Sequence, residues 1–496
     1  MIATPETMVH DVTQEFQALI DYVTNEESRH RTAYDVERTL FRRLLALGAA
    51  LLQLFFASRA ATRPSEPRTT PTGRRMRYTG MRETTYVSVF GPVRFARHYY
   101  TAPGQPGTCP LDAELSLPKR CYSDLLREWF TYGATEVSYR ATQDLLTHIL
   151  GQTLSVQALE TGMQETAEDA TTFFAQPPDP TPVDPTATIL VAQADGKGVP
   201  LCQSLHDQQP ARLKRGQKRS KKKEAIVTSS YTIAPHPRTP EAVVAALLHE
   251  KPPTGAASGE RPAPVGKELR ATLAGKAVAL ERLAQRVGQH DHTHIQQRVA
   301  LTDGAEALQQ QMQAHLPQHT LVLDIIHATE YLWDAVTSWL GETHPERQDW
   351  MRRQLTHLLR GETQTVISWL ERVASDEAVT PSQRAALLRT AGYYRRNQAY
   401  MRYDHYLAQG WPIGTGVVEG ACRHVVKDRM EQSGMRWTEV GAQAVLNLRA
   451  IRINGQWETY WAYHRQQQHE RRYAGKGSVA PQWELTFDSN LFHWAA

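Results

Sequence analysis

The chain has 496 residues, of which 41% are hydrophobic and 22% are charged, and its net charge is +4. This composition is typical of a soluble globular protein, and the length is too great for one hydrophobic core, so we expect two to four domains. The four cysteines include no C-x-x-C pair, which argues against a disulfide framework and a zinc finger and favours a reduced cytoplasm. A sequence pI of about 8.7 permits a polyanionic partner where basic residues cluster.

The N-terminal region, residues 1–59, repeats apolar residues at helical spacing and is expected to be helical. Its one long apolar run, residues 44–56, is too short to span a bilayer and lies too far from the start for a signal peptide. We therefore interpret the run as a buried helix and expect no contact with a membrane.

Residues 60–118 are expected to form a linker rich in Pro, Thr and Arg, followed by a β-hairpin. Strand-forming residues flank a turn at Gly91-Pro92, and this pattern predicts the hairpin. Residues 119–175 show helical periodicity with breaks like those of a helix-turn-helix unit, which would enter a DNA major groove. A plain helical bundle is the alternative for the same pattern.

A proline-rich segment, residues 176–188, marks the clearest domain boundary in the chain. Beyond it, apolar runs end on acids: one precedes Asp195, a second precedes Asp303, and a third precedes Asp324. Helical patterns follow the last two of these acids, which is typical of an α/β domain with its functional groups at strand ends.

The rest of the chain completes this organisation. We expect a core in residues 176–340, which includes a helix at 269–287. A helical insertion should follow at 341–410, and a final helix-bearing part of the core at 411–460. A loosely held tail is expected at 461–496.

Three acids are candidates for catalysis: Asp195, Asp303 and Glu419. Glu419 lies near the start of a predicted helix, in an apolar context flanked by glycines. Phosphoryl transfer with two metal ions needs carboxylates that flank a Mg²⁺ pair about 4 Å apart, and hard Mg²⁺ takes only one or two carboxylates per ion. Arg423 and Lys427 lie one and two turns further along the helix, where they would meet phosphates.

Each acid also has a simpler interpretation. Asp-Gly is a common turn dipeptide, so Asp195 and Asp303 are each explained by a strand that ends there. Glu419 with Arg423 is explained by a surface ion pair. The combination of three such acids with a basic segment favours the functional interpretation.

The chain resembles the ISKra-type insertion-sequence transposases, which are bacterial DDE enzymes with an RNase H-like fold. The resemblance covers about residues 76–460. It rests on the combination of ADGKGVP, VALTDGAEAL, LDIIHATEYLW, GTGVVEGACRHVVKDRM and SGMRWTEVGAQAVLNLRA. It implies that Asp195, Asp303 and Glu419 are the DDE triad and bind Mg²⁺ or Mn²⁺. It also implies an α+β multidomain protein whose RNase H-like core carries an all-helical insertion before the last acid.

Asp324 competes with Asp303 for the place of the second aspartate. The second acid of such a sheet follows the strand next to the one that bears the first acid, which favours Asp303. The resemblance implies that Asp324 and His327 form the D-x-x-H signature of the related Mutator-like transposases, supporting the site or facing DNA. A helix N-cap and a buried histidine are the alternative.

The densest basic run would hold DNA phosphates without reading sequence, and a solvated loop is its alternative. Tyrosines and arginines at 393–403 suggest either a surface that stacks on bases or, because they repeat at helical spacing, core residues. The predicted DNA-binding residues of the basic run are Arg212, Lys214, Arg215, Lys218, Arg219, Lys221, Lys222 and Lys223.

The sequence thus predicts a transposase that binds the ends of an insertion sequence, cuts them with a metal pair and joins them to target double-stranded DNA. We expect it to act as a homo-oligomer on DNA in the bacterial cytoplasm, associated with the nucleoid. The alternatives are a nuclease of the same fold without strand transfer and a catalytically inactive DNA-binding protein.

Overall fold

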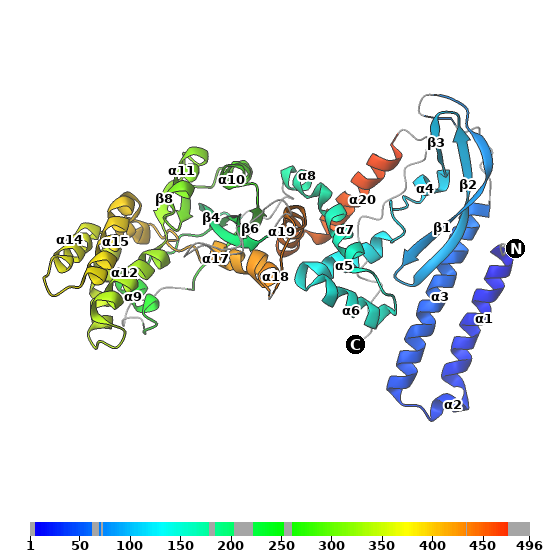
Figure 1. Ribbon diagram of the computed structural model, residues 1–496, viewed down its shortest axis with the longest axis horizontal. Helices are drawn as coiled ribbons and strands as arrows, with labels where there is room; N and C mark the ends of the chain where they lie inside the picture. The colour runs from blue at the N-terminus through cyan, green and yellow to red at the C-terminus, as the bar shows by residue number, and fades with distance from the viewer. Residues whose placement is uncertain are drawn as a thin grey trace, which may run out of the picture. The chain divides into compact units, whose positions relative to one another are not determined.

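The computed structural model in Figure 1 describes seven stretches of the chain. Contacts divide the chain into two compact units, and each is described here by itself: unit 1 comprises residues 1–173 and 456–496, and unit 2 comprises residues 174–455. The described stretches are residues 5–61, 69–70, 73–177, 184–202, 222–251, 260–432 and 434–474.

Unit 1 contains an antiparallel sheet of three strands in the order β1-β2-β3. The predicted β-hairpin is confirmed, because β1 and β2 pair from Arg77 with Thr101 to Ser88 with Gly91. The unit 1 elements are α1 (Pro5–Thr24), α2 (Glu26–Arg29), α3 (Ala33–Ala61), β1 (Arg77–Ser88), β2 (Gly91–Ala102), β3 (Gln105–Thr108), α4 (Pro110–Glu114), α5 (Asp124–Glu136), α6 (Tyr139–Leu150), α7 (Val156–Thr166), a 3₁₀ turn (Ala167–Asp169) and α20 (Trp457–Tyr473); α8 (Ala170–Ala175) runs across the boundary with unit 2.

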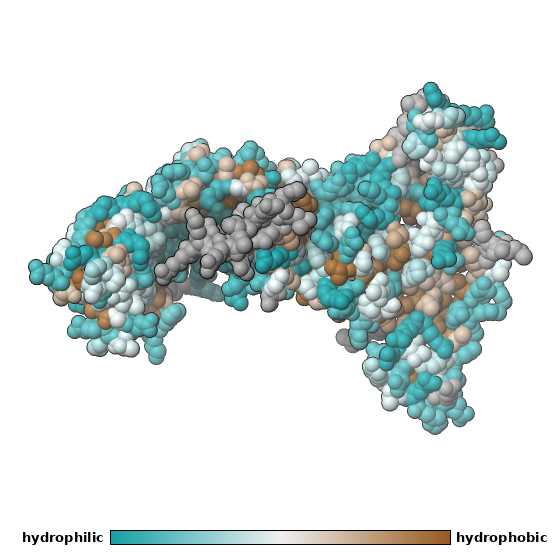
Figure 2. All heavy atoms as spheres, viewed as in Figure 1, coloured by the Kyte–Doolittle hydropathy of each residue, from teal (hydrophilic) through white to brown (hydrophobic). Residues whose placement is uncertain are grey.

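The apolar run at residues 44–56 lies in α3, and its interpretation as a buried helix is wrong. Leu44, Leu51 and Phe55 are each between 47% and 48% exposed. Helix α3 packs against β2, where Phe56 stacks on Phe95, and against α1, where the Arg43 guanidinium lies 4.5 Å from the centre of the Tyr22 ring. Figure 2 shows apolar surface, in tan and brown, along the part of α3 that remains exposed. By length and composition alone, α3 is the one helix of the described residues that could cross a membrane, with only 17% of its most apolar window buried.

The helices expected in residues 119–175 are present as α5, α6 and α7. Each begins at a serine whose hydroxyl accepts a hydrogen bond from a backbone N–H of the first turn: Ser123, Ser138 and Ser155. Gly151 ends α6 in the left-handed conformation, with φ 68°. Leu126, Phe130 and Leu159 are buried between these helices, so local caps and a small apolar core position the three helices together.

The first part of the tail predicted for residues 461–496 is helical and packed, and residues 475–496 lie outside the described residues. Helix α20 extends to Tyr473, and His464 within it is fully buried, with its Nδ1 2.6 Å from Asp169 Oδ2. The Tyr473 hydroxyl donates a 2.8 Å hydrogen bond to the Leu117 carbonyl. Polar composition suggested a loose tail, but aromatic and histidine side chains anchor this helix in unit 1.

A partly buried carboxyl in α5 makes the stability of unit 1 depend on pH. Burial raises the pKa of Glu128 to about 7, and the nearby Glu458 carboxylate adds to the rise. The Glu128 carboxyl therefore stays protonated in the folded state over a pH range in which it is ionised in the unfolded chain. The free energy of unfolding should fall as pH rises from about 4.5 to about 7. We expect Glu128→Gln to be more stable than wild type by about 1–2 kcal/mol at pH 8, and equal to it at pH 4. Urea unfolding at both pH values measures this, and Glu15→Gln on the exposed side of α1 is the control, for which no such gain is expected.

Unit 2 is built around a mixed sheet of five strands in the order β6-β5-β4-β7-β8. The central strand β4 pairs antiparallel with β5 and parallel with β7, and β8 continues in parallel beyond β7. Buried residues on both faces, such as Leu190 and Val191, place β4 in the middle of two apolar cores. The strands are β4 (Ile189–Pro200), β5 (Lys222–Ile233), β6 (Val265–Thr272), β7 (Gln297–Thr302) and β8 (Thr320–Leu323).

Two predictions about these strands are wrong. The helix predicted at 269–287 is two elements, because β6 pairs with the outer edge of β5 before α10 begins at Lys276. The β4 strand does not end at Asp195 but continues to Pro200, held by β5 over its whole length. Pairing with a neighbouring strand overrides the local pattern in both places.

The all-helical character predicted for residues 341–410 is confirmed for this part of unit 2. Tyr394 and Tyr403 are fully buried, and Tyr393 stacks on Tyr331 with ring centroids 3.8 Å apart, so these tyrosines form core. The unit 2 helices are α9 (Pro240–Leu247), α10 (Lys276–His290), α11 (Glu306–His315), α12 (Ile325–Leu340), α13 (Arg347–Leu359), α14 (Thr363–Ala374), α15 (Pro381–Asn397), a 3₁₀ turn (Gln398–Tyr400), α16 (Tyr403–Ala408), α17 (Gly416–Ala421), a π-helical segment (Cys422–Lys427), α18 (Asp428–Met430) and α19 (Glu439–Ile453).

Candidate active site

The register of the sheet brings Asp195 and Asp303 to the same edge. Gln193 of β4 lies opposite Leu301 of β7, and each aspartate stands two residues further along its own strand. Burial raises the pKa of Asp195, and the Asp303 carboxylate raises it further, while hydrogen bonds from Cys422 and the Gly196 N–H oppose the rise. Two carboxylates that face each other in this way favour a bound cation.

The turn after Asp303 depends on Gly304. Its φ of 86° is unfavourable for other residues, and an added Cβ would lie 2.6 Å from the Tyr393 hydroxyl and 2.8 Å from Leu323. The Tyr393 hydroxyl donates a 2.8 Å hydrogen bond to the Asp303 carbonyl. Asp303 Oδ1 accepts from the Ala305 N–H, and Oδ2 accepts no hydrogen bond from the described residues, so one oxygen is available to a ligand.

Asp324 is the N-cap of α12 and is fully buried. One of its oxygens accepts from the His327 N–H at 2.8 Å and contacts His327 Nδ1 at 2.7 Å. The other oxygen accepts from the Thr415 N–H at 2.8 Å. Both oxygens are therefore engaged in holding α12, His327 and the Thr415 loop together, which confirms the N-cap interpretation.

Glu419 is brought to this edge by α17. Its carboxylate accepts a hydrogen bond from the Thr415 hydroxyl, and its side chain is 37% exposed. The helix predicted to carry Glu419, Arg423 and Lys427 is interrupted after Ala421 by the π-helical segment. Such wide turns are frequent at functional sites, and this one carries Cys422, whose thiol lies 3.3 Å from Asp195 Oδ2.

Gln193 positions α17 against the sheet, and the sequence analysis missed it. It is fully buried on β4, its side-chain oxygen accepts from the Val418 N–H at 3.0 Å, and its amide nitrogen lies 3.2 Å from the Tyr231 hydroxyl. Because Val418 precedes Glu419, this hydrogen bond fixes the third acid relative to the strand that carries the first. A buried glutamine two residues before an aspartate in an otherwise apolar run is the signal that could have identified it.

His327 is a cation among these acids. The hydrogen bond to Asp324 raises the pKa of its imidazole to about 9, and the charges of Asp324 and Asp303 act in the same direction. Its Nδ1 also lies 4.0 Å from Glu419 Oε1. At neutral pH this imidazole is protonated and partly neutralises the carboxylates around it.

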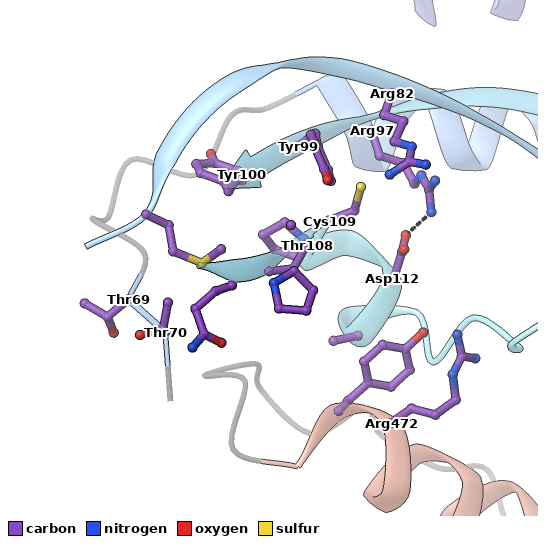
Figure 3. Close-up of a pocket in the computed structure, with 17 residues that line it drawn as sticks. Thr69, Thr70, Arg82, Arg97, Tyr99, Tyr100, Thr108, Cys109, Asp112 and Arg472 are labelled. Atoms are coloured by element: carbon purple, nitrogen blue, oxygen red, sulfur yellow. Dashed lines mark hydrogen bonds and ion pairs between the residues drawn. The ribbon is translucent and has the colours of Figure 1, made fainter. Parts of the chain in front are cut away.

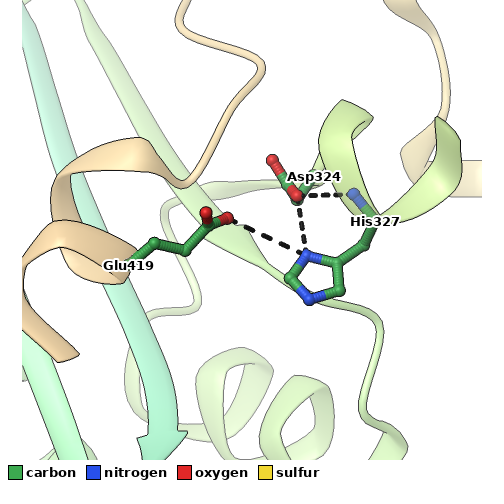
Figure 4. A group of neighbouring side chains, drawn as sticks. All are labelled: Asp324, His327 and Glu419. Atoms are coloured by element: carbon green, nitrogen blue, oxygen red, sulfur yellow. Dashed lines mark hydrogen bonds and ion pairs between the residues drawn. The ribbon is translucent and has the colours of Figure 1, made fainter. Parts of the chain in front are cut away.

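Asp324, His327 and Glu419 form the metal-compatible group of the described residues, with ligand atoms within 4.8 Å of one another (Figure 4). The imidazole lies between the two carboxylates, with both dashed contacts meeting at Nδ1. Both carboxylate oxygens of Asp324 already accept hydrogen bonds, from the backbone N–H groups of His327 and Thr415. The group is therefore better suited to hold Glu419 in place than to bind an ion by itself. Asp195, Asp303 and Glu419 do not form such a group, because their carboxylate oxygens are not all within 4.8 Å of one another. Asp303 and Glu419 each keep one carboxylate oxygen that accepts no hydrogen bond from the described residues.

The thiol of Cys422 should be unreactive. Burial raises its pKa well above the usual range, and the charge of Asp195 raises it further. We expect iodoacetamide at pH 8 to modify the exposed Cys121 and Cys202 in the folded protein and to leave Cys422 unmodified. Peptide mass spectrometry measures the modification, and equal labelling of Cys202 and Cys422 would contradict the burial of this thiol.

The basic residues predicted to bind DNA are only partly described. Lys222 and Lys223 pair with Glu431 and Glu439, with N–O distances of 2.6 and 2.5 Å. Arg423 and Lys427 are exposed, and Arg423 lies 3.7 Å from Asp428 rather than beside Glu419. The other predicted residues, Arg212, Lys214, Arg215, Lys218, Arg219 and Lys221, lie outside the described residues.

Comparison with known proteins gives one neighbour to report. No family model matches the chain, and no curated protein sequence matches it. Among solved structures, the chain is similar to the Drosophila P element transposase strand transfer complex, with a TM-score of 0.24 and 9% identity over 73% of this chain and 85% of that chain. A similarity this weak assigns neither a family nor a function to the chain, so the function must be inferred from the geometry of the site.

Proposed function

We propose that the protein is a DDE transposase that cleaves and joins DNA with divalent metal ions held by Asp195, Asp303 and Glu419. The observation that supports the proposal is that adjacent elements bear the three acids: Asp195 lies on β4, Asp303 directly follows β7, which pairs with β4, and Glu419 lies on α17, whose Val418 N–H bonds to Gln193 of β4. Phosphoryl transfer needs this set of hard oxygen ligands.

The order of the strands supports an RNase H-like core. The first strand, β4, lies in the middle; the second and third, β5 and β6, extend the sheet antiparallel on one side, and β7 and β8 extend it in parallel on the other. In such a core the first acid stands on the central strand and the second follows the adjacent parallel strand. In this proposal Asp195, on β4, is the first acid and Asp303, directly after β7, is the second.

The residues present fit a pair of Mg²⁺ or Mn²⁺ ions. Asp303 keeps one carboxylate oxygen free of hydrogen bonds from the described residues. Burial and, to a lesser extent, the Asp303 carboxylate raise the pKa of Asp195, and a bound cation would favour its ionised form. When bound, such ions activate a water and stabilise the leaving oxygen of the cut strand. Gln193, Asp324 and Thr415 hold the acids, and protonated His327 stands where it would contact a phosphate or Glu419.

The test is cleavage and joining of labelled duplexes made from the DNA that flanks the coding sequence, with Mg²⁺ and with EDTA. We expect cuts that leave a 3′-hydroxyl, and joined products with a second duplex, only when the metal is present. Cleavage without joined products would instead indicate a nuclease. Binding without cleavage under any metal would indicate a DNA-binding protein that does not catalyse.

A further inference from the structure

A pocket in unit 1, formed by residues distant in sequence from the three acids, is lined by more arginine than carboxylate side chains. It has a volume of about 410 Å³, within the range of small-molecule sites. Arg82 and Arg97 extend into it from neighbouring strands, and Arg472 reaches it from α20 (Figure 3). Three guanidinium groups thus face one carboxylate, that of Asp112, which leaves an excess of two positive charges.

The two strand arginines lie in an unfavourable arrangement for an isolated protein. Arg82 of β1 is directly opposite Arg97 of β2 in the sheet, and like charges at opposite positions destabilise a strand pair. Asp112 pairs with Arg97, whose side chain is 11% exposed and whose Nε is buried without a hydrogen-bond partner. Among the described residues Arg82 forms no ion pair and shares only the more distant charge of Asp112, so an anion bound here would relieve the repulsion between the two arginines.

Tyrosine rings line the same pocket. The Arg82 guanidinium lies 5.1 Å from the centre of the Tyr99 ring, and that of Arg472 lies 4.9 Å from the centre of the Tyr473 ring. Gly107 makes room for Tyr99, because an added Cβ would lie 2.1 Å from its hydroxyl. Arginines with flat rings beside them suit a ligand that has both a phosphate and an aromatic base.

We propose that this pocket binds one unpaired nucleotide of a DNA strand, with its phosphate between Arg82, Arg97 and Arg472 and its base against Tyr99. The proposal rests on the proposed function, since it assigns to unit 1 a second contact with the same DNA. It explains why the β-hairpin carries two opposed arginines and why Asp112 neutralises only one of them.

The experiment measures the affinity of the full chain for a fluorescent single-stranded oligonucleotide by anisotropy, with EDTA present so that metal binding and cleavage play no part. We expect Arg82→Gln and Tyr99→Leu to weaken binding roughly tenfold. Arg94→Gln is the matched control, because Arg94 is an exposed arginine of the same hairpin that does not line the pocket, and it should change affinity less than about twofold. Arg82 is itself exposed, so its replacement should leave the fold intact.

Two further probes separate the base from the phosphate. An abasic strand should bind more weakly than the normal strand, and Tyr99→Leu should not change its affinity. Inorganic phosphate should displace the normal strand only partially. If the abasic strand binds as tightly as the normal one, the pocket is an anion site and the nucleotide proposal is wrong. If Arg82→Gln binds like Arg94→Gln while the protein still cuts DNA with Mg²⁺, this inference fails and the proposed function stands; if no DNA is bound at all, both fail.

Discussion

Replacing Asp303 with asparagine should reduce Mg²⁺-dependent DNA cleavage about a thousandfold or more, because the change would remove a carboxylate ligand of the proposed metal pair. The fold should be unaffected, since the Asp303 side-chain bond to the Ala305 N–H can be made equally well by an amide oxygen. Cleavage of a labelled duplex measures the loss, with thermal unfolding and DNA affinity measured on the same samples.

Asp324→Asn is the informative comparison, because Asp324 was the rival for second acid. Its oxygens hold His327 and the Thr415 loop, so an amide there should lower the unfolding temperature and reduce cleavage by about 10–100-fold rather than abolish it. Asp334→Asn, on the exposed side of α12, is the control and should behave as wild type. An active Asp303→Asn beside a dead but stable Asp324→Asn would assign the second place to Asp324.

Replacing Glu268 with alanine should destabilise unit 2 by about 3–5 kcal/mol. Glu268 is 5% exposed on β6, its Oε1 accepts from Arg270 at 2.7 Å, and its other oxygen pairs with Arg286 of α10. Without the carboxylate, Arg286 remains as an uncompensated charge with its side chain 7% exposed. Urea unfolding followed by tryptophan fluorescence measures the change.

The matched control is Glu241→Ala. Glu241 also pairs with an arginine, Arg360, at 2.7 Å, but both side chains are more than two-fifths exposed. Removal of this pair should cost less than about 1 kcal/mol. Equal losses for the two alanine variants would show that the Glu268 pair is not buried in solution.

Part of the site followed from local sequence. An apolar run that ends at an acid and a glycine predicted the end of β7 at Asp303. This inference succeeded because a strand end is encoded by a few adjacent residues. The apolar, glycine-flanked context of Glu419 predicted a buried site, whereas its side chain is 37% exposed. The placement of Arg423 beside Glu419 failed, since a π-helical turn changes which residues share a face and leaves no mark in the periodicity.

What the sequence could not supply depends on contacts between distant segments. Strand β6 was taken for a helix because its residues have helical spacing, and only the free edge of β5 makes it a strand. Gln193 and Asp324 acquire their roles from Val418 and Thr415, more than ninety residues away in both cases, as the spacings of 225 and 91 show. The exposure of one side of α3 could not be predicted for the same reason, because apolar composition does not show which faces of a helix pack against other elements.

The most direct test of the central claim is a crystal structure of the protein soaked with Mn²⁺, with the ions located by their anomalous scattering. We expect peaks between the carboxylates of Asp195, Asp303 and Glu419, and none when Asp303→Asn crystals are soaked in the same way. A peak bound by Asp324, His327 and Glu419 with none beside Asp195 would contradict the proposed triad and move the metal centre to the neighbouring strand.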